Sequence, residues 1–139
     1  MAKKTGSCLC GAVRFTAEPE KNEIDACHCG MCRKTAGGPV MAVMCGGSLQ
    51  IEEEAAVGWY QSSDWGERGF CKTCGSSLFW RLRDKSMTSV HAGAFDDVSD
   101  MTFTTEIFVD SKPTYYAFAG KHKMMTEADV MKAFSEGKS

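Results

Sequence analysis

Seven of the eight cysteines fall into three tight clusters, and their number and spacing point to metal chemistry. The clusters are Cys8/Cys10, Cys27/Cys29/Cys32 and Cys71/Cys74. The two pairs together supply four thiolates, which is the full tetrahedral set of a structural zinc site. The remaining triplet would leave one position of a second zinc ion open, which is the usual arrangement of a catalytic metal.

The pair Cys71 and Cys74 has the spacing of a zinc knuckle and is followed by Gly75. Two intervening residues let both sulfurs face one ion while they accept backbone N–H groups, and Gly75 supplies the positive φ that such turns often need. Cys8 and Cys10 form a shorter clamp that also precedes a glycine. We therefore expect these four cysteines to hold a structural zinc, whose binding free energy contributes directly to folding.

The triplet Cys27, Cys29 and Cys32 is compact enough for one loop to wrap around one side of an ion. Three thiolates on a divalent zinc leave a net negative charge, which weakens the metal as a Lewis acid for hydrolysis. Such a zinc still accepts an incoming thiol and holds it as a thiolate near neutral pH. The triplet therefore predicts thiol activation more than water activation.

Neighbouring residues leave alternatives open at this second site. Cys45 could be a fourth ligand that closes the site, or a buried strand residue. His28, between two of the cysteines, could carry protons or be an exposed neighbour. Arg33, Lys34 and Arg68 could neutralise the anionic site and attract a carboxylated thiol, or could be ordinary solvated charges.

Other cysteine chemistries fit the pattern less well. An iron–sulfur cluster normally requires four cysteines, and the triplet has three. A thiol oxidoreductase using Cys71 and Cys74 is a further alternative, since a lone CxxC is also a redox motif. A disulfide scaffold is weakened by the close spacing of Cys8 and Cys10 and by the expectation of a chain without a secretory signal peptide.

Length and composition indicate one globular domain over residues 1–139, because 43% of the residues are hydrophobic and 24% are charged. The net charge of −2 offers no electrostatic footprint for nucleic acid. The N-terminus leads into no apolar signal region, and no apolar run reaches membrane-spanning length. We therefore expect a cytoplasmic protein without a membrane or nucleic-acid partner, whose oligomeric state the sequence leaves open.

Short strands separated by glycines must position these cysteines. Strands are expected over residues 11–17, 40–43, 48–52, 57–60, 77–83, 87–94 and 103–109. Gly46 and Gly47 predict a hairpin turn before 48–52. One helix is expected at the C-terminus, with Thr126 as its N-cap and an apolar stripe that includes Val130. The predicted fold class is mainly β with a short C-terminal helix.

Three motifs in this order resemble the glutathione-dependent formaldehyde-activating enzyme family. They are CxCGxVxF over residues 8–15, CHCxxCRK over 27–34 and FCxxCGSxLF over 70–79. Segments 91–97 and 107–113 are also similar, so that the resemblance covers roughly residues 5–120. Glu106 stands where family members often carry histidine, and Thr114 and Tyr115 where they often carry tryptophan.

The resemblance implies a β-tent fold of stacked antiparallel sheets and two zinc sites per chain. The implied ligands are Cys8, Cys10, Cys71 and Cys74 for the structural zinc and Cys27, Cys29 and Cys32 for the second zinc. A site with only three protein ligands can lose its metal, so the second site can be partly empty. The implied activity is that of a carbon–sulfur lyase that combines glutathione and formaldehyde into S-hydroxymethylglutathione. The alternative is a non-catalytic zinc domain that binds a small thiol or a protein partner.

Overall fold

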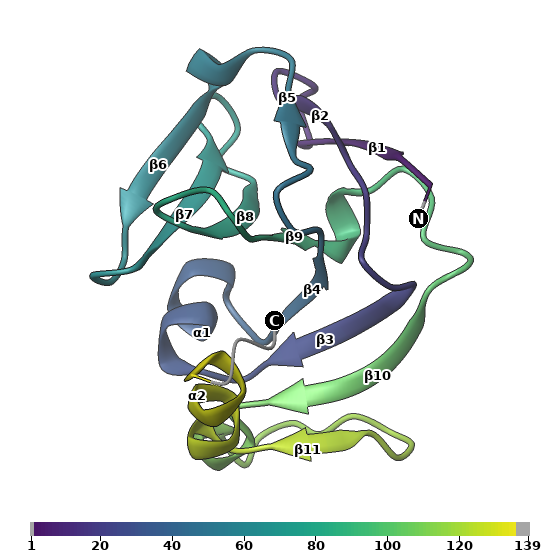
Figure 1. The fold of residues 1–139 in the computed structure, drawn as a ribbon, viewed down its shortest axis with the longest axis vertical. Coiled ribbons are helices and arrows are strands. Elements are labelled where there is room, and N and C mark those ends of the chain that lie inside the picture. Colours follow the sequence, from purple (N-terminus) through teal and green to yellow (C-terminus); the bar gives the residue numbers. More distant parts are fainter. Residues whose placement is uncertain (1, 136–139) are drawn as a thin grey trace.

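The computed structural model describes residues 2–135 and contains two β-sheets and two α-helices (Figure 1). The smaller sheet has the order β1-β2-β5 and is antiparallel. Its strands are β1 (Lys4–Ser7), β2 (Arg14–Ala17) and β5 (Gln50–Ile51). The prediction of a mainly β chain with a C-terminal helix is confirmed.

The larger sheet has eight strands in the order β11-β10-β3-β4-β9-β8-β7-β6 and bends strongly along its length (Figure 1). Its strands are β3 (Glu23–Cys27), β4 (Val40–Met44), β6 (Val57–Gln61), β7 (Gly66–Cys71), β8 (Ser77–Leu82), β9 (Thr88–His91), β10 (Thr102–Ile107) and β11 (Lys123–Met125). Strand β10 pairs in parallel with both β3 and β11, so this sheet is mixed.

The predicted hairpin at Gly46 and Gly47 is wrong. β4 pairs with β3 and β9 in the large sheet, whereas β5 pairs with β2 in the small sheet. The backbone at Gly46 has a φ of 54°, and this turn carries the chain from one sheet to the other. The two glycines therefore mark a turn, but its partner strand lies elsewhere in the fold.

Helix α1 (Gly30–Ala36) was not expected, and it lies in the bend of the large sheet (Figure 1). The side chain of Cys29 caps its first turn, and Gly37 ends it in the left-handed conformation with a φ of 82°. Within the described residues 2–135, three short 3-10 helices also occur, at Glu54–Ala56, Ala92–Ala94 and Val109–Ser111. A seven-residue helix with a sulfur cap has little local signal in the sequence.

Helix α2 (Glu127–Ser135) begins at the predicted N-cap. The hydroxyl of Thr126 accepts a hydrogen bond from the backbone N–H of Asp129, and the Asp129 carboxylate accepts one from the N–H of Thr126. This reciprocal pair satisfies two backbone donors that the helix leaves free. Val130 is the buried residue of the helix.

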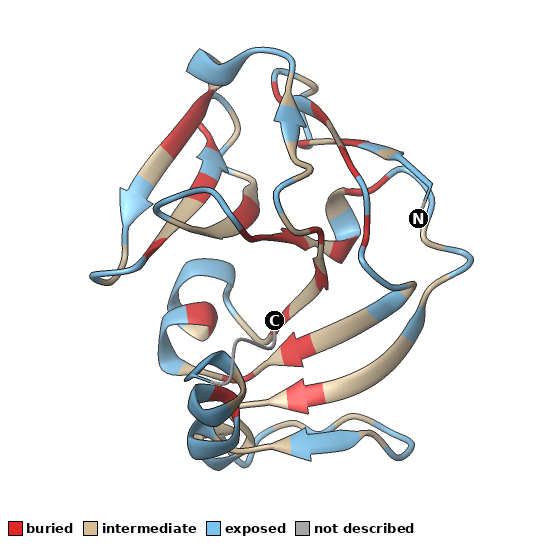
Figure 2. Cartoon of the chain, in the orientation of Figure 1, coloured by how far each residue is buried: buried red, intermediate tan, exposed pale blue. Residues whose placement is uncertain are grey.

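The main core lies where the small sheet packs against the centre of the large sheet (Figure 2). Phe15 and Phe79 meet there edge to face, with ring centroids 5.1 Å apart. Val13, Val43 and Val90 are fully buried around them. A second group of buried residues lies at the ends of β3 and β10, beside α1, and includes the carboxylate of Glu106.

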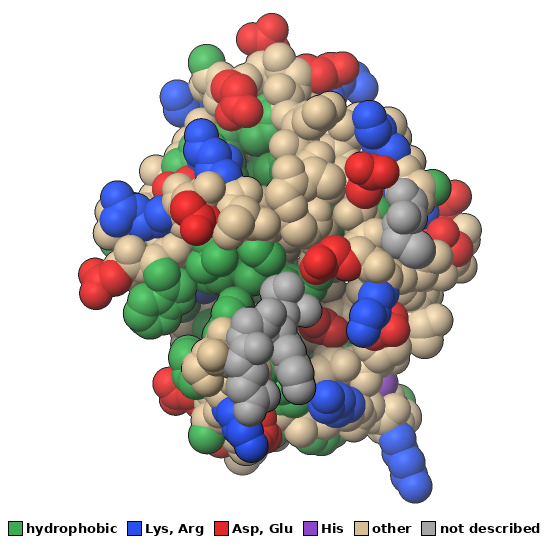
Figure 3. All heavy atoms as spheres, in the orientation of Figure 1, with side chains coloured by type: hydrophobic (Ala, Val, Ile, Leu, Met, Phe, Trp, Pro, Cys, Tyr) green, Lys and Arg blue, Asp and Glu red, His purple; other side chains and the backbone are tan. Residues whose placement is uncertain are grey.

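Acidic and basic side chains alternate over the face shown in Figure 3, without a large region of one sign. This distribution agrees with the near-zero net charge and offers no continuous basic surface on that face. Within residues 2–135, no helix is long and apolar enough to cross a membrane.

Candidate metal centres

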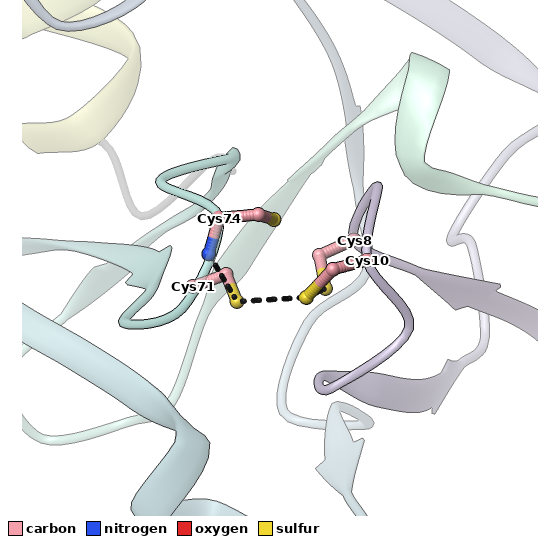
Figure 4. A group of neighbouring side chains, drawn as sticks. All are labelled: Cys8, Cys10, Cys71 and Cys74. Atoms are coloured by element: carbon pink, nitrogen blue, oxygen red, sulfur yellow. Dashed lines mark hydrogen bonds between the residues drawn. The ribbon is translucent and has the colours of Figure 1, made fainter.

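The first cluster brings together Cys8, Cys10, Cys71 and Cys74, whose sulfurs all lie within 4.8 Å of one another. Cys8 and Cys10 belong to the turn between β1 and β2, whereas Cys71 is the last residue of β7 and Cys74 lies in the turn that leads to β8. Figure 4 shows the two turns facing each other with their sulfurs pointing into the space between them. The cluster thus joins the two sheets at positions 61 residues apart in the chain.

The spacing of these sulfurs fits a tetrahedral metal site. Zinc–sulfur bonds of about 2.3 Å at tetrahedral angles place neighbouring sulfurs about 3.8 Å apart. The Sγ atoms of Cys8 and Cys10 are 3.7 Å apart, and those of Cys10 and Cys71 are 3.8 Å apart. A disulfide would need about 2.05 Å, and all eight cysteines are free thiols. The four residues therefore fit zinc.

Backbone N–H groups point at these sulfurs, as the knuckle spacing predicts. Val13 donates to Cys8 at 3.3 Å, and Thr73 and Cys74 donate to Cys71 at 3.3 and 3.4 Å. Such bonds stabilise a thiolate, and so stabilise a metal-binding sulfur.

Glycine and serine residues complete the two turns. Gly11 and Gly75 have φ angles of +83° and +79°, which side chains rarely adopt. The hydroxyl of Ser76 lies 3.1 Å from the sulfur of Cys74. This hydrogen bond, together with backbone hydrogen bonds from Ser76 and Cys10, lowers the pKa of Cys74 to about 5. The turn after β7 therefore favours an ionised sulfur at Cys74. At Cys10 the backbone hydrogen bond from Ala12 is outweighed by desolvation and the neighbouring sulfurs, which raise its pKa to about 11.

The second cluster contains Cys27, Cys29 and Cys32, whose sulfurs also lie within 4.8 Å of one another. Cys27 ends β3, Cys29 is the N-cap of α1, and Cys32 lies in the first turn of that helix. The backbone N–H of Cys32 donates to the sulfur of Cys29 at 3.3 Å. The end of a strand and the start of a helix thus present three sulfurs from one short segment.

Charge at this cluster is balanced by its neighbours. Hydrogen bonds with Cys27 and then Cys32 hold the pKa of Cys29 well below its ordinary value, and the nearby charge of Arg68 acts in the same direction. The guanidinium of Arg68 lies against the sulfur of Cys32, with Nη1 at 3.7 Å. Of the charged residues that the sequence offered, Arg68 is therefore the one that contacts a cysteine.

Arg33 has a different role. Its Nε donates to the carbonyl of His28 at 3.1 Å and its Nη2 to the carbonyl of Ser111 at 3.4 Å. These contacts tie the start of α1 to the turn after β10. Lys34 is exposed.

Cys45 lies outside both clusters. Its side chain is 1% exposed, and its sulfur donates to the carbonyl of Val43 at 3.6 Å. Burial, with a smaller contribution from Glu20, raises the pKa of Cys45 to about 12, so this thiol stays protonated. The structure thus favours a buried thiol, directly after the end of β4, over the fourth ligand.

His28 is completely buried, so the alternative of an exposed neighbour is wrong. Successive residues of an extended chain point to opposite faces, and His28 therefore turns away from the sulfurs of Cys27 and Cys29. Its Nε2 lies 2.8 Å from Oε1 of Glu106, and its Nδ1 lies 2.7 Å from the hydroxyl of Tyr116. The contact with Glu106 ties the segment that carries Cys27 and Cys29 to β10, on the side of the segment away from the sulfurs.

Glu106, flagged by the sequence as a departure, joins two histidines. Its Oε2 lies 2.8 Å from Nδ1 of His122, and its carboxylate is 3% exposed. Burial alone raises the pKa of Glu106, but the hydrogen bonds from His28 and His122 outweigh it and hold that pKa below its ordinary value. An ionised Glu106 therefore receives an N–H from each histidine, and Tyr116 donates to His28 when that imidazole is neutral.

A groove of about 720 Å³ lies between the four-cysteine turns and the end of α1. Cys8 and Ser76 line it on one side, Thr35 on another, and His91 forms part of its wall. Its size is in the range of small-molecule sites. His91, Tyr116 and His122 were not singled out from the sequence, where isolated histidines and tyrosines carry no signal.

Comparison with known proteins places the chain in a family. Residues 3–111 match the model of the family described as glutathione-dependent formaldehyde-activating enzyme. The chain belongs to this family. The match includes all seven clustered cysteines and ends before Tyr116 and His122, so part of the support behind His28 comes from beyond the matched region.

Two relatives align with most of this chain. A Schizosaccharomyces pombe protein named as an uncharacterized lyase is 36% identical over 96% of this chain and 98% of its own. A Halomonas elongata protein named "Putative glutathione-dependent formaldehyde-activating enzyme" is 34% identical over 79% of this chain and 77% of its own.

A crystal structure of a Rhodobacter sphaeroides protein has the same fold. It superposes with a TM-score of 0.58 at 22% identity and covers 66% of this chain and 87% of that one.

Proposed function

We propose that this protein is a zinc-dependent carbon–sulfur lyase acting on adducts of glutathione with a small aldehyde, formaldehyde being the expected one. Membership of the family and the names of the two relatives support this assignment. The observation that carries it is the division of the sulfurs into a group of four and a separate group of three. Four thiolates complete a metal's coordination, and three leave a position for substrate.

In this proposal Cys8, Cys10, Cys71 and Cys74 hold the structural zinc, and Cys27, Cys29 and Cys32 hold the second. When bound at the triplet, zinc supplies a position at which a substrate thiol stays ionised near neutral pH. Arg68 offsets the negative charge of the sulfurs from one side. Both groups require reduced thiols, which suits a reducing compartment such as the cytoplasm.

Adduct formation needs no redox partner. The glutathione sulfur forms a bond to the carbonyl carbon of the aldehyde, and the π electron pair of the carbonyl moves onto its oxygen. That oxygen then takes up one proton. The thiol has given up one proton, so the number of protons is unchanged overall. The reverse reaction breaks the same carbon–sulfur bond, and we propose that the groove beside α1 receives the peptide part of glutathione in both directions.

The test is to add the zinc-loaded protein to glutathione and formaldehyde and measure their exchange with the adduct by NMR. We expect exchange faster than the spontaneous rate. Cys29→Ser should abolish the acceleration, whereas Cys45→Ala, at a buried cysteine outside both clusters, should retain it. Exchange at the spontaneous rate with the wild-type protein, both metal sites being filled, would refute the assignment to this substrate pair.

A further inference from the structure

Two buried nitrogen atoms on one face of the large sheet lack a hydrogen-bond partner. Among the residues that the structure describes, three buried side-chain nitrogen or oxygen atoms are unpartnered, and two of these are Nε of Arg68 and Nε2 of His91. Buried polar atoms are nearly always hydrogen-bonded, and leaving one unpaired costs about 1–3 kcal/mol. Two of them on one face of a sheet indicate a group that they bind together.

The strand register places these two residues close together. Arg68 on β7 is opposite Trp80 on β8, and Trp80 is opposite Ser89 on β9. Opposite residues share a face of the sheet, and so do residues two apart along a strand. His91, two residues after Ser89, therefore faces the same side as Arg68, and the Arg68 charge is near enough to help lower the pKa of His91.

The same face continues to the three-cysteine cluster. His91 is opposite Ala42 on β4, and Val40, two residues before Ala42, is opposite Cys27 on β3. Cys27 therefore shares the face of His91, and Arg68 reaches Cys32 on the helix that covers this face. Both unpartnered nitrogens thus lie on the substrate side of the proposed site.

One of the two nitrogens is a donor and the other an acceptor. Nδ1 of His91 lies 2.9 Å from the carbonyl of Ser77, which can only accept, so Nδ1 carries the proton and Nε2 has a free lone pair. Burial, with a smaller contribution from Arg68, lowers the pKa of His91 to about 4, so the imidazole is neutral at physiological pH. Nε of Arg68 always carries a hydrogen.

We propose that Arg68 and His91 together bind the hydroxyl group of the thiol–aldehyde adduct and make the site selective for it. Nε–H of Arg68 donates to the hydroxyl oxygen, and Nε2 of His91 accepts the hydroxyl hydrogen. A hydroxyl fills both roles at once, whereas the methyl group of a plain thioether fills neither. This inference rests on the proposed function, because it identifies the part of the adduct that the chain recognises.

The test compares two ligands that differ in that hydroxyl. S-hydroxymethylglutathione and S-ethylglutathione have side groups of equal length, and each is titrated into the zinc-loaded protein by NMR. We expect the hydroxymethyl adduct to bind at least about tenfold more tightly, as one hydrogen bond to a charged group and one to a neutral group imply. The ¹⁵N resonance of Nε2 of His91 should shift with the hydroxymethyl adduct and not with the ethyl analogue.

Variants separate recognition from folding. His91→Phe and Arg68→Met should each reduce the preference for the hydroxyl, taken as the ratio of the two affinities, to less than about threefold. Any effect of a variant on the metal site or on the groove acts on both ligands and cancels in that ratio. Arg68→Lys should recover part of the preference. Arg83→Met is the control and should leave the preference intact, because Arg83 is exposed in the turn that follows β8. Metal analysis and thermal unfolding show whether each variant is folded.

The outcomes distinguish the two proposals. If the wild-type protein binds both glutathione ligands equally, or if the variants keep the preference, the hydroxyl site is refuted and the proposed function stands. An unmoved Nε2 resonance with the hydroxymethyl adduct also refutes the site, because it shows that the adduct does not contact His91. If the wild-type protein binds neither ligand, both proposals fail.

Discussion

Replacing Cys10 by serine tests whether a metal ion holds the two sheets together. Cys10 is exposed, so its side chain contributes little packing. An exposed cysteine without a metal should tolerate serine within about 0.5 kcal/mol. If Cys10 is a ligand, the substitution removes one of four thiolates and weakens or empties the site.

The magnitude follows from the loop that the cluster closes. The sulfurs of Cys10 and Cys71 meet across 61 residues, and a cross-link of that span reduces the entropy of the unfolded chain by an amount worth about 4 kcal/mol. Domains of this size are typically stable by about 5–15 kcal/mol. Cys10→Ser should therefore remove a large part of the free energy of unfolding, of the order of 4 kcal/mol.

The assay is guanidinium unfolding of the wild-type protein and the variant, followed by tryptophan fluorescence, with zinc bound and after chelation. The two zinc-loaded proteins should differ by about 4 kcal/mol, and the two chelated proteins should be equal. Leu9→Ser is the matched control, because Leu9 is 90% exposed between the two cysteines. A zinc-loaded variant within about 1 kcal/mol of wild type would refute the metal cross-link.

Four further substitutions test particular residues. Cys45→Ala should keep two zinc ions per chain by metal analysis and lower stability by about 1 kcal/mol. His91→Gln tests linkage to pH: because the pKa of His91 falls from 6.5 to about 4 on folding, only the unfolded chain takes up this proton between those values. Unfolding measured from pH 7 to pH 4 should therefore show the wild-type protein losing up to about 3 kcal/mol relative to the variant, and parallel curves would contradict this. Glu106→Gln should lower the unfolding temperature, with a loss of roughly 1–3 kcal/mol in the free energy of unfolding. An amide has one accepting oxygen and one donating NH₂ group, so it cannot accept a hydrogen bond from each histidine on a separate oxygen. Gly6→Ala would place a Cβ 2.3 Å from the ring of Phe15, and calorimetry should show a loss of at least about 1–3 kcal/mol.

Features that depend on local spacing could be predicted from the sequence. The turn at Cys71, with its two N–H···S bonds and the positive φ of Gly75, follows from a knuckle whose parts are four residues apart. The N-cap of α2 at Thr126 is equally local. Most strands were found for the same reason, because their alternation is read over a few residues.

Features that depend on distant partners could not be predicted. Strand β3 forms between its antiparallel partner β4 and its parallel partner β10, and β10 lies about eighty residues later in the chain. Glu106 would normally be solvated, since a lone carboxylate is rarely buried. It is buried because His28, directly after β3, and His122, directly before β11, each contact one of its two oxygens.

The sequence by itself determined the family, the mainly β character and the division of seven cysteines into four and three. Each of these depends on patterns among residues that are close together along the chain. Only the tertiary structure decided what surrounds each sulfur. It buried Cys45 away from both clusters, turned His28 away from them, and brought Arg68 to Cys32. These choices depend on strand register and on a helix packed in the bend of the sheet, which join residues that are far apart along the chain.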